Sequence, residues 1–161
     1  MKLGRPLVGL LTAGVLLLAA GPAVASSSDR PFTATFVGHV AMPVPGQAVF
    51  DGAGQANHMG RIGTDGLAFV TGLDESTCPG GLANVHVETL TAANGDTLTI
   101  TSLDVACPAA PGTFDGTGHW TVTGGTGRFA NATGAGSFVG TVDFGTGTFT
   151  ITLNGDLALG G

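Results

Sequence analysis

The stretch Gly124-Gly125-Thr126-Gly127-Arg128-Phe129 decides the fold that this sequence predicts. A regular strand pattern at 119–123 runs into it, and an apolar hairpin pattern leads from it to Leu159. Glycines weaken a strand and are kept where a backbone bends sharply or passes close to another segment. We therefore interpret the stretch as a structural corner, at which a sheet turns and closes on itself. The corner residues are Gly124, Gly125, Gly127 and Phe129.

Two hairpin patterns flank this corner. In the hairpin before it, Asn94-Gly95 supplies the positive φ angles of a tight turn and sets Thr91 opposite Leu98. Leu103 and Val105 are out of phase with Ile100, which predicts a bulge near 101–103. The register also forms an apolar face from Val85, Val87, Leu98 and Ile100. In the hairpin after the corner, a four-residue loop at 145–148 sets Phe144 opposite Phe149 and gathers the large apolar residues on one face.

The chain as a whole reads as a series of strands. It contains about eight extended segments with short connections and no sustained helical period. Strands with one apolar face and hairpin connections are typical of a closed barrel or a sandwich. We predict an all-β fold, an antiparallel β-barrel of about eight strands. A barrel of that size is either filled by side chains or holds one small ligand.

The N-terminus predicts export. Lys2 and Arg5 precede an apolar run at 7–20, and Ala23-Val24-Ala25 is a small-residue cleavage signature. The run is too short to span a bilayer comfortably, so we expect no membrane span in the mature protein. The expected parts are a signal peptide (1–25), a flexible leader (26–31) and a single barrel domain (32–161). The protein is then secreted or extracellular, or periplasmic if its host has an outer membrane.

Charge and cysteine content restrict the partners and the compartment. Removal of the signal peptide leaves three arginines and no lysine against 11 acidic residues, a formal charge of −8. Such a surface repels phosphate backbones, so we expect no nucleic-acid partner. Cys78 and Cys107 predict a disulfide, the usual state of a cysteine pair in an exported chain. Because Pro79 and Pro108 follow them, we expect both cysteines in loops.

The corner also carries a resemblance. Gly-Gly-Thr-Gly-Arg-Phe at 124–129, followed by Gly-x-Gly-x-Phe-x-Gly-Thr-Val at 134–142, resembles the allene oxide cyclase and dirigent-like β-barrel superfamily. The similarity covers roughly residues 113–155, and 58–61 and 92–96 are compatible with it. It implies an eight-stranded antiparallel barrel with an apolar cavity, often oligomeric in plant members, which allows a homo-oligomer here. Plant cyclases rearrange a fatty-acid epoxide, and dirigent proteins orient phenoxy radicals or quinone methides. Those sites depend on tyrosine, which this chain lacks, so neither activity is carried over.

No catalytic, cofactor or metal constellation is recognisable in the sequence. The histidines at 39, 58, 86 and 119 come from four segments, and we interpret them mainly as rim or surface residues. His86 and Glu88 share one face of a strand and are the candidates for a cavity. They superficially resemble a deaminase zinc signature, but the Cys-x-x-Cys partner is absent. No lysine follows the glycines, which excludes a phosphate-binding loop.

Two functions remain open at this stage. The first is a non-catalytic module that binds a small apolar ligand or takes part in extracellular or envelope interactions. The second is an isomerase or cyclase-like enzyme acting on an apolar substrate inside the barrel, which rests on fold analogy alone. The packing of the barrel interior distinguishes these two ligand-dependent functions from a purely structural role. An open apolar cavity with convergent polar groups favours a ligand, whereas a solidly packed lumen excludes one.

Overall fold

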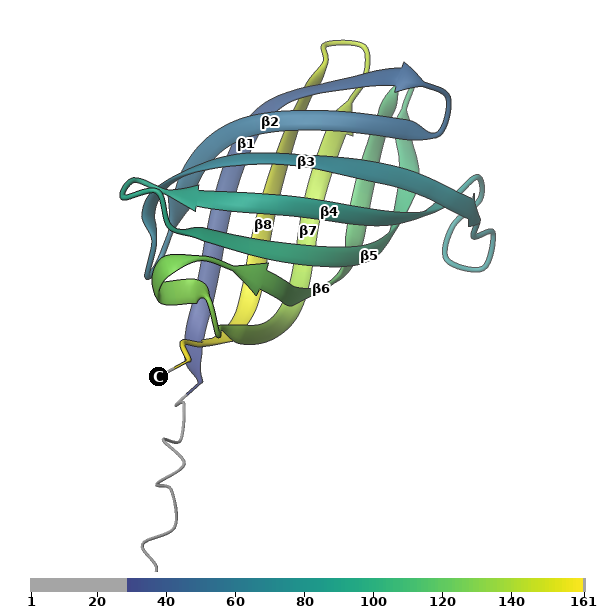
Figure 1. The fold of residues 1–161 in the computed structure, drawn as a ribbon. Helices are drawn as coiled ribbons and strands as arrows, with labels where there is room; N and C mark the ends of the chain where they lie inside the picture. Colours follow the sequence, from purple (N-terminus) through teal and green to yellow (C-terminus); the bar gives the residue numbers. More distant parts are fainter. Residues whose placement is uncertain (1–28, 161) are drawn as a thin grey trace, which may run out of the picture.

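The computed structural model of the protein describes residues 29–160, which form one closed antiparallel β-barrel of eight strands (Figure 1). Each strand pairs with its sequence neighbours, and β1 pairs with β8 to close the ring. The strands are β1 (Arg30–Val44), β2 (Gln47–Ala56), β3 (Gly60–Leu73), β4 (Leu82–Ala92), β5 (Thr97–Ala110), β6 (Thr113–Gly125), β7 (Thr133–Asp143) and β8 (Thr148–Ala158). A short 3-10 turn, η1 (Gly127–Phe129), joins β6 to β7. The prediction of an eight-stranded antiparallel barrel is confirmed.

The first strand begins slightly earlier than the sequence predicts. Arg30 lies opposite Leu157 of β8, so Arg30 and Pro31 belong to the barrel and not to a leader. The predicted signal peptide, residues 1–25, lies outside the described residues.

Two-residue alternation decides which side chains enter the lumen. In β1, Phe32, Ala34 and Phe36 are buried, whereas Thr33 and Thr35 between them are exposed. Successive residues of a strand point to opposite faces of the sheet. In a closed barrel one of those faces is the lumen, so the alternation of apolar and polar residues becomes an inside and an outside.

The lumen is packed at one end, the closed end. Trp120 is completely buried there, and its ring meets Phe32 edge-on with 5.5 Å between the centroids. The indole Nε1 donates a hydrogen bond to the Ser137 carbonyl at 3.1 Å. The large side chains that fill this half are Phe32, Met59, Ile62, Leu90, Leu98, Ile100, Trp120, Phe129, Leu153 and Leu157.

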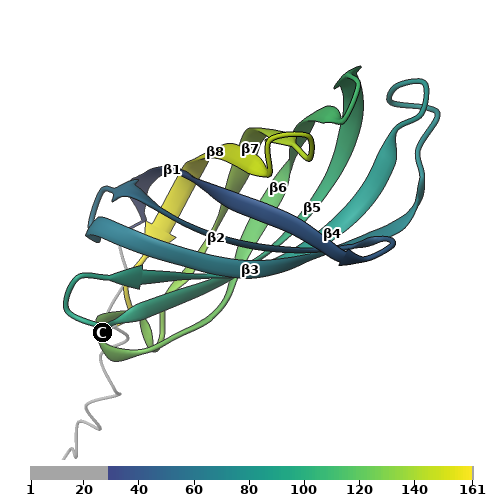
Figure 2. The same ribbon diagram turned by 90° about the horizontal axis from the view of Figure 1, so that it is seen from above.

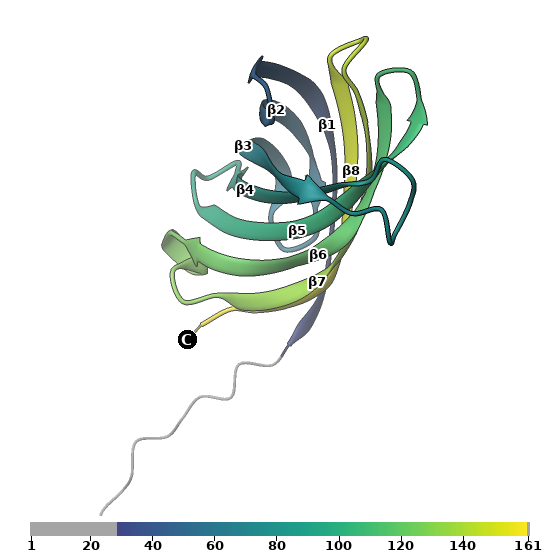
Figure 3. The same cartoon turned by 90° about the vertical axis from the view of Figure 1, so that its right-hand side faces the viewer.

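The opposite end of the barrel is the mouth. It carries the β1–β2, β3–β4, β5–β6 and β7–β8 loops, and Figure 2 shows the C-terminus at the other end. In Figure 3 the strands surround the lumen and the β3–β4 loop lies across the front of the view. The side chains that face the lumen near the mouth are therefore the ones that can meet a ligand from solvent.

The glycine-rich stretch lies at the closed end. β6 ends at Gly125, and Gly127, with a φ of +55°, begins the 3-10 turn. The backbone N–H of Arg128 donates to Asp96 Oδ2 at 3.3 Å, and a Cβ on Gly127 would collide with the same carboxylate. Glycine suits this position because it has no side chain to oppose either the positive φ or the close approach. Phe129 follows, fully buried.

The register predicted for the β4–β5 hairpin is wrong by one residue. Thr91 lies opposite Thr97 and not Leu98, because Asp96 extends the turn. The Asp96 N–H donates to Asn94 Oδ1 at 3.2 Å, and Asn94 Nδ2 donates to Asp96 Oδ2 at 2.9 Å. A slip of one residue exchanges the two faces of a strand. Val87 is therefore 42% exposed, and the face that enters the lumen contains Asn84, His86, Glu88 and Leu90.

The predicted bulge is also misplaced. The register between β5 and β6 shifts between Thr99 and Ile100, not over 101–103. Leu103 consequently stays on the outer face, where it is 61% exposed, and Ser102 and Asp104 are buried. The prediction assumed that the large apolar side chains of β5 all point inward, and the barrel instead buries polar ones at these positions.

The last hairpin differs in register but keeps its faces. Val142, and not Phe144, lies opposite Phe149, so the loop occupies 144–147. The Phe144 N–H donates to the Gly112 carbonyl of the β5–β6 turn at 2.9 Å, which removes this residue from the ladder. Because the shift is two residues, the predicted apolar face is retained.

The predicted disulfide is present, with a Cα–Cα distance of 5.9 Å between Cys78 and Cys107. Cys78 lies in the β3–β4 loop as expected, but Cys107 lies within β5, opposite Asp115 of β6. Its loop placement was therefore wrong: Pro108 lies inside the strand. The bond fastens the β3–β4 loop to β5 close to the mouth.

Candidate functional site

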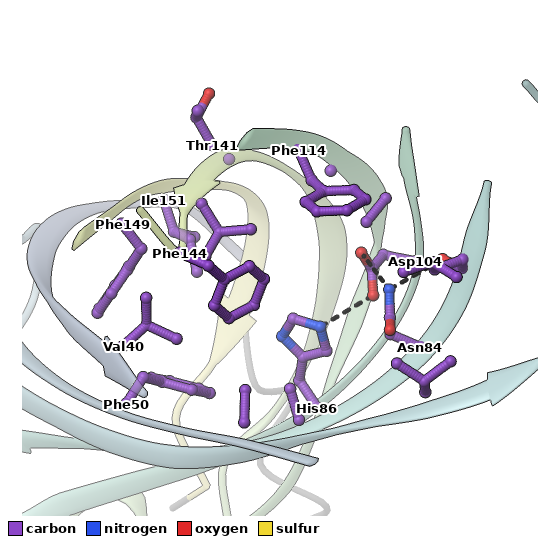
Figure 4. Close-up of a pocket in the computed structure, with 18 of the residues that line it drawn as sticks. Val40, Phe50, Asn84, His86, Asp104, Phe114, Thr141, Phe144, Phe149 and Ile151 are labelled. Carbon is purple, nitrogen blue, oxygen red and sulfur yellow. Dashed lines mark hydrogen bonds and ion pairs between the residues drawn. The ribbon is translucent and has the colours of Figure 1, made fainter. Parts of the chain in front are cut away.

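An open cavity of about 110 Å³ occupies the mouth half of the lumen. It forms because several inward positions there are small: Ala48, Ala68, Ala106, Gly116 and Gly140. The corresponding positions of the closed end hold large side chains that fill the space. Most of the remaining wall is aliphatic or phenylalanine (Figure 4), from Val40, Phe50, Phe114, Phe138, Val142, Phe144, Phe149 and Ile151. The cavity is thus suited to an apolar body of small size.

One wall of this cavity is polar. His86 and Asn84 on β4 face Asp104 on β5, and all three line the cavity. His86 Nε2 lies 3.0 Å from Asp104 Oδ1, and Asn84 Nδ2 donates to Asp104 Oδ2 at 3.4 Å (Figure 4). Asn84 Nδ2 also donates to the Leu82 carbonyl at 2.9 Å. The three side chains form a connected polar cluster, Asn84–Asp104–His86, in a largely apolar site. The other polar residue of the lining, Thr141, donates its hydroxyl to Asp115 Oδ1 at 2.7 Å.

Asp104 is the most enclosed member of the cluster, with 3% of its side chain exposed. Glycines of β6 make room for it. A Cβ on Gly118 would approach the Asp104 Cβ to 2.6 Å, and one on Gly116 would come within 3.2 Å of Oδ2. A carboxylate so deeply buried requires partners. Asn84 donates to Oδ2, whereas Oδ1 has only the contact with His86, which is not aligned as a hydrogen bond. The aspartate is therefore an organising group behind the cavity wall rather than a freely accessible one.

His86 is more open, with 16% of its side chain exposed. Its ring lies between Phe50 and Phe138, whose ring centroids are 6.2 and 5.9 Å from its own. The contact with Asp104 has the length of an ion pair but not the direction of a good hydrogen bond, and Asp104 Oδ1 has no other partner. A small rotation of the imidazole about χ2 would align Nε2–H better with Asp104 Oδ1, because the χ2 torsion of histidine is soft.

Glu88 lies deeper than the cavity. It is 3% exposed, and its Oε1 has no hydrogen-bond partner, as is also true of the buried Thr64 Oγ1. Burial raises the pKa of Glu88 to about 7, and the charge of His86 opposes this increase. Glu88 is not among the residues that line the cavity. It is an acid inside the barrel wall with no ligand contact of its own.

The two residues predicted for a cavity, His86 and Glu88, thus both face the lumen, and His86 alone lines the open space. Sequence reasoning missed Asn84 and Asp104. A polar residue at every second position, Asn84-x-His86-x-Glu88, was the available signal, and the one-residue error in register obscured it.

The remaining candidates lie elsewhere. His39, His58 and His119 are exposed, and the corner residues lie at the closed end, away from the cavity. Within residues 29–160, no three His, Cys, Asp or Glu side chains are grouped as a metal site would require. In the same part of the chain, no helix has the length and hydrophobicity needed to cross a membrane.

No protein-family model and no curated protein sequence matches this chain. The resemblance to the allene oxide cyclase and dirigent-like superfamily therefore stays a prediction.

Proposed function

We propose that the protein is an exported, non-catalytic barrel that binds a small apolar molecule in its mouth. The observation that carries this proposal is the division of the lumen, packed around Trp120 at one end and open at the other. A purely structural barrel has no need of the small residues at 48, 68 and 106 that keep the mouth half open. The disulfide is consistent with an oxidising compartment, which supports export.

The size of the cavity limits the ligand. At about 110 Å³ it is near the ~150 Å³ of an engineered apolar cavity that binds benzene. It is well below the ~300–1,000 Å³ of pockets for drug-sized molecules. We therefore propose a ligand with a single ring or a short branched chain inside the barrel. A longer molecule would extend out through the mouth.

The alternative, an isomerase or cyclase-like enzyme, has weaker support. Proton-transfer chemistry of that kind usually needs an acid and a base that both reach the substrate. His86 lies at the cavity wall, but Asp104, although it also lines the cavity, has only 3% of its side chain exposed, and Glu88 does not line the cavity. One accessible titratable group favours recognition of a ligand over turnover.

Titration with toluene, followed by NMR of the backbone amides, tests the binding proposal. We expect saturable shifts confined to residues around the cavity, such as Gly116 and Gly140. Ala68→Phe fills the cavity and should abolish them, whereas the matched change Ala53→Phe, on the exposed face of β2, should not. Shifts that do not saturate, or that survive in Ala68→Phe, would contradict the proposal.

A further inference from the structure

The contact between His86 and Asp104 favours one position for the proton of the His86 imidazole. Nε2 lies 3.0 Å from Asp104 Oδ1, a separation at which two lone pairs would repel each other. A carboxylate oxygen accepts a hydrogen bond and cannot donate one. When the ring is neutral and carries one proton, that proton is therefore on Nε2. Asn84 donates to Asp104 Oδ2 at 3.4 Å and helps to orient the carboxylate so that Oδ1 lies next to Nε2.

The other ring nitrogen is then a free acceptor. Figure 4 shows it on the side of the ring away from Asp104, toward Phe144 and the open part of the cavity. None of the described residues donates a hydrogen bond to it. The surrounding side chains are apolar, so in a filled and dry cavity this lone pair lacks a partner unless the ligand supplies a donor. A polar atom left unpaired on burial is costly.

Charge excludes the ionic ligands. A carboxylate would lie against Asp104, with Glu88 two residues beyond His86 on the same strand face, and no lysine or arginine is among the described residues lining the cavity. An ammonium group would have to leave water for a largely apolar site in which Asp104 Oδ2 already accepts from Asn84 and Oδ1 lies behind His86 Nε2 at 3.0 Å. A neutral donor meets neither obstacle.

We propose that the ligand of the mouth cavity is a neutral hydroxyl compound: an apolar, ring-sized body whose O–H donates a hydrogen bond to Nδ1 of His86. This inference rests on the proposed binding function and specifies its ligand class. His86 is the residue that distinguishes this ligand from a plain hydrocarbon. Asp104 acts on the ligand indirectly, because it keeps the proton of the neutral ring on Nε2 and so leaves Nδ1 as a hydrogen-bond acceptor.

The experiment compares ligands of one skeleton at ~pH 8, where imidazoles are largely neutral. The ligands are toluene, benzyl alcohol, benzyl methyl ether, benzoate and benzylamine. By amide NMR titration we expect benzyl alcohol to bind about tenfold tighter than its methyl ether, which cannot donate. Benzoate and benzylamine should bind more weakly than benzyl alcohol. Equal affinities for the alcohol and the ether, or tighter binding of either ion, would overturn the hydroxyl assignment.

Two further measurements isolate the role of His86. Long-range proton–nitrogen NMR of the unliganded wild type should show the hydrogen on Nε2, and a hydrogen on Nδ1 would overturn the proposal without any mutation. In His86→Leu, the affinity ratio of benzyl alcohol to toluene should fall about tenfold, while toluene still binds. An unchanged ratio would also overturn it. If toluene and benzyl alcohol both fail to bind the wild type, the proposed binding function itself fails, which is a different result.

Discussion

At the scale of one residue, Glu88 shows how the barrel interior accommodates a carboxyl group, which is by keeping it mainly protonated in mildly acidic solution. The side chain is 3% exposed and Oε1 has no partner, so the ionised form would be left without solvation. The protonated form avoids most of that cost. Burial accordingly raises the pKa of Glu88 from 4.5 to about 7. The residue is then mainly neutral in mildly acidic solution and increasingly charged above neutrality.

This pKa makes folding stability depend on pH in a defined direction. The folded protein holds the proton of Glu88 more tightly than the unfolded chain, so stability falls as pH rises from 4.5 to about 7. The full loss attributable to Glu88 is about 3 kcal/mol. Glu88→Gln cannot lose this proton, so its free energy of unfolding should decline less over the same range. Above neutrality it should exceed that of the wild type.

Urea unfolding followed by the fluorescence of Trp120, the single tryptophan, measures this difference. The matched control is Glu75→Gln in the exposed β3–β4 loop, which should leave the pH dependence of the wild type unchanged. If Glu88→Gln and the wild type lose stability in parallel, Glu88 is not the titrating group.

At the scale of elements, the disulfide joins the β3–β4 loop to β5. These two segments are not paired with each other in the strand ladder. Cys78 and Cys107 are 29 positions apart, and closing a loop of that length restricts the unfolded chain by about 3–4 kcal/mol. The double variant Cys78→Ser with Cys107→Ser should have a free energy of unfolding lower by about 3–4 kcal/mol, and its urea midpoint should fall accordingly. Its strand pairing should persist, because β4, β5 and β6 keep their ladders.

Reductant provides the control for this prediction. Dithiothreitol should lower the midpoint of the wild type to that of the double variant and leave the variant unchanged. An equal midpoint for oxidised wild type and variant would show that the bond does not contribute to stability.

Hairpins also show what could be predicted from the sequence and what could not. The number of strands and their antiparallel order follow from local patterns that each segment carries by itself, and the cysteine pairing follows from the presence of only two cysteines. Register does not, because it depends on turn geometry. Asp96 lengthens the β4–β5 turn by bonding to Asn94, and this moved Val87 outside and Asn84 inside. Sequence reasoning names His86 as a cavity residue but does not name its partner Asp104, because the bulge that it predicts over 101–103 turns Leu103 and Val105 inward, whereas the barrel buries Ser102 and Asp104.

At the scale of the whole molecule, the outer face of the barrel carries an apolar row. Val49, Leu67 and Val87 lie opposite one another on β2, β3 and β4, and each is between 36% and 42% exposed. Cross-strand neighbours of this kind form a continuous patch. Phe69, 39% exposed, extends the row toward the mouth. A contiguous apolar patch on a soluble surface is a common contact site.

We predict that this row mediates weak self-association of the barrel. Residues 26–161 carry a formal charge of −8, so two copies repel each other, and salt should strengthen their association by screening this repulsion. Sedimentation velocity over a concentration series should show a dimer that increases with salt. Leu67→Lys should remove it, whereas Thr121→Lys, an equal change in charge at an exposed position of β6, should not. A wild type that stays monomeric at high salt and high concentration would exclude this contact, and the outer row would then be an ordinary exposed face.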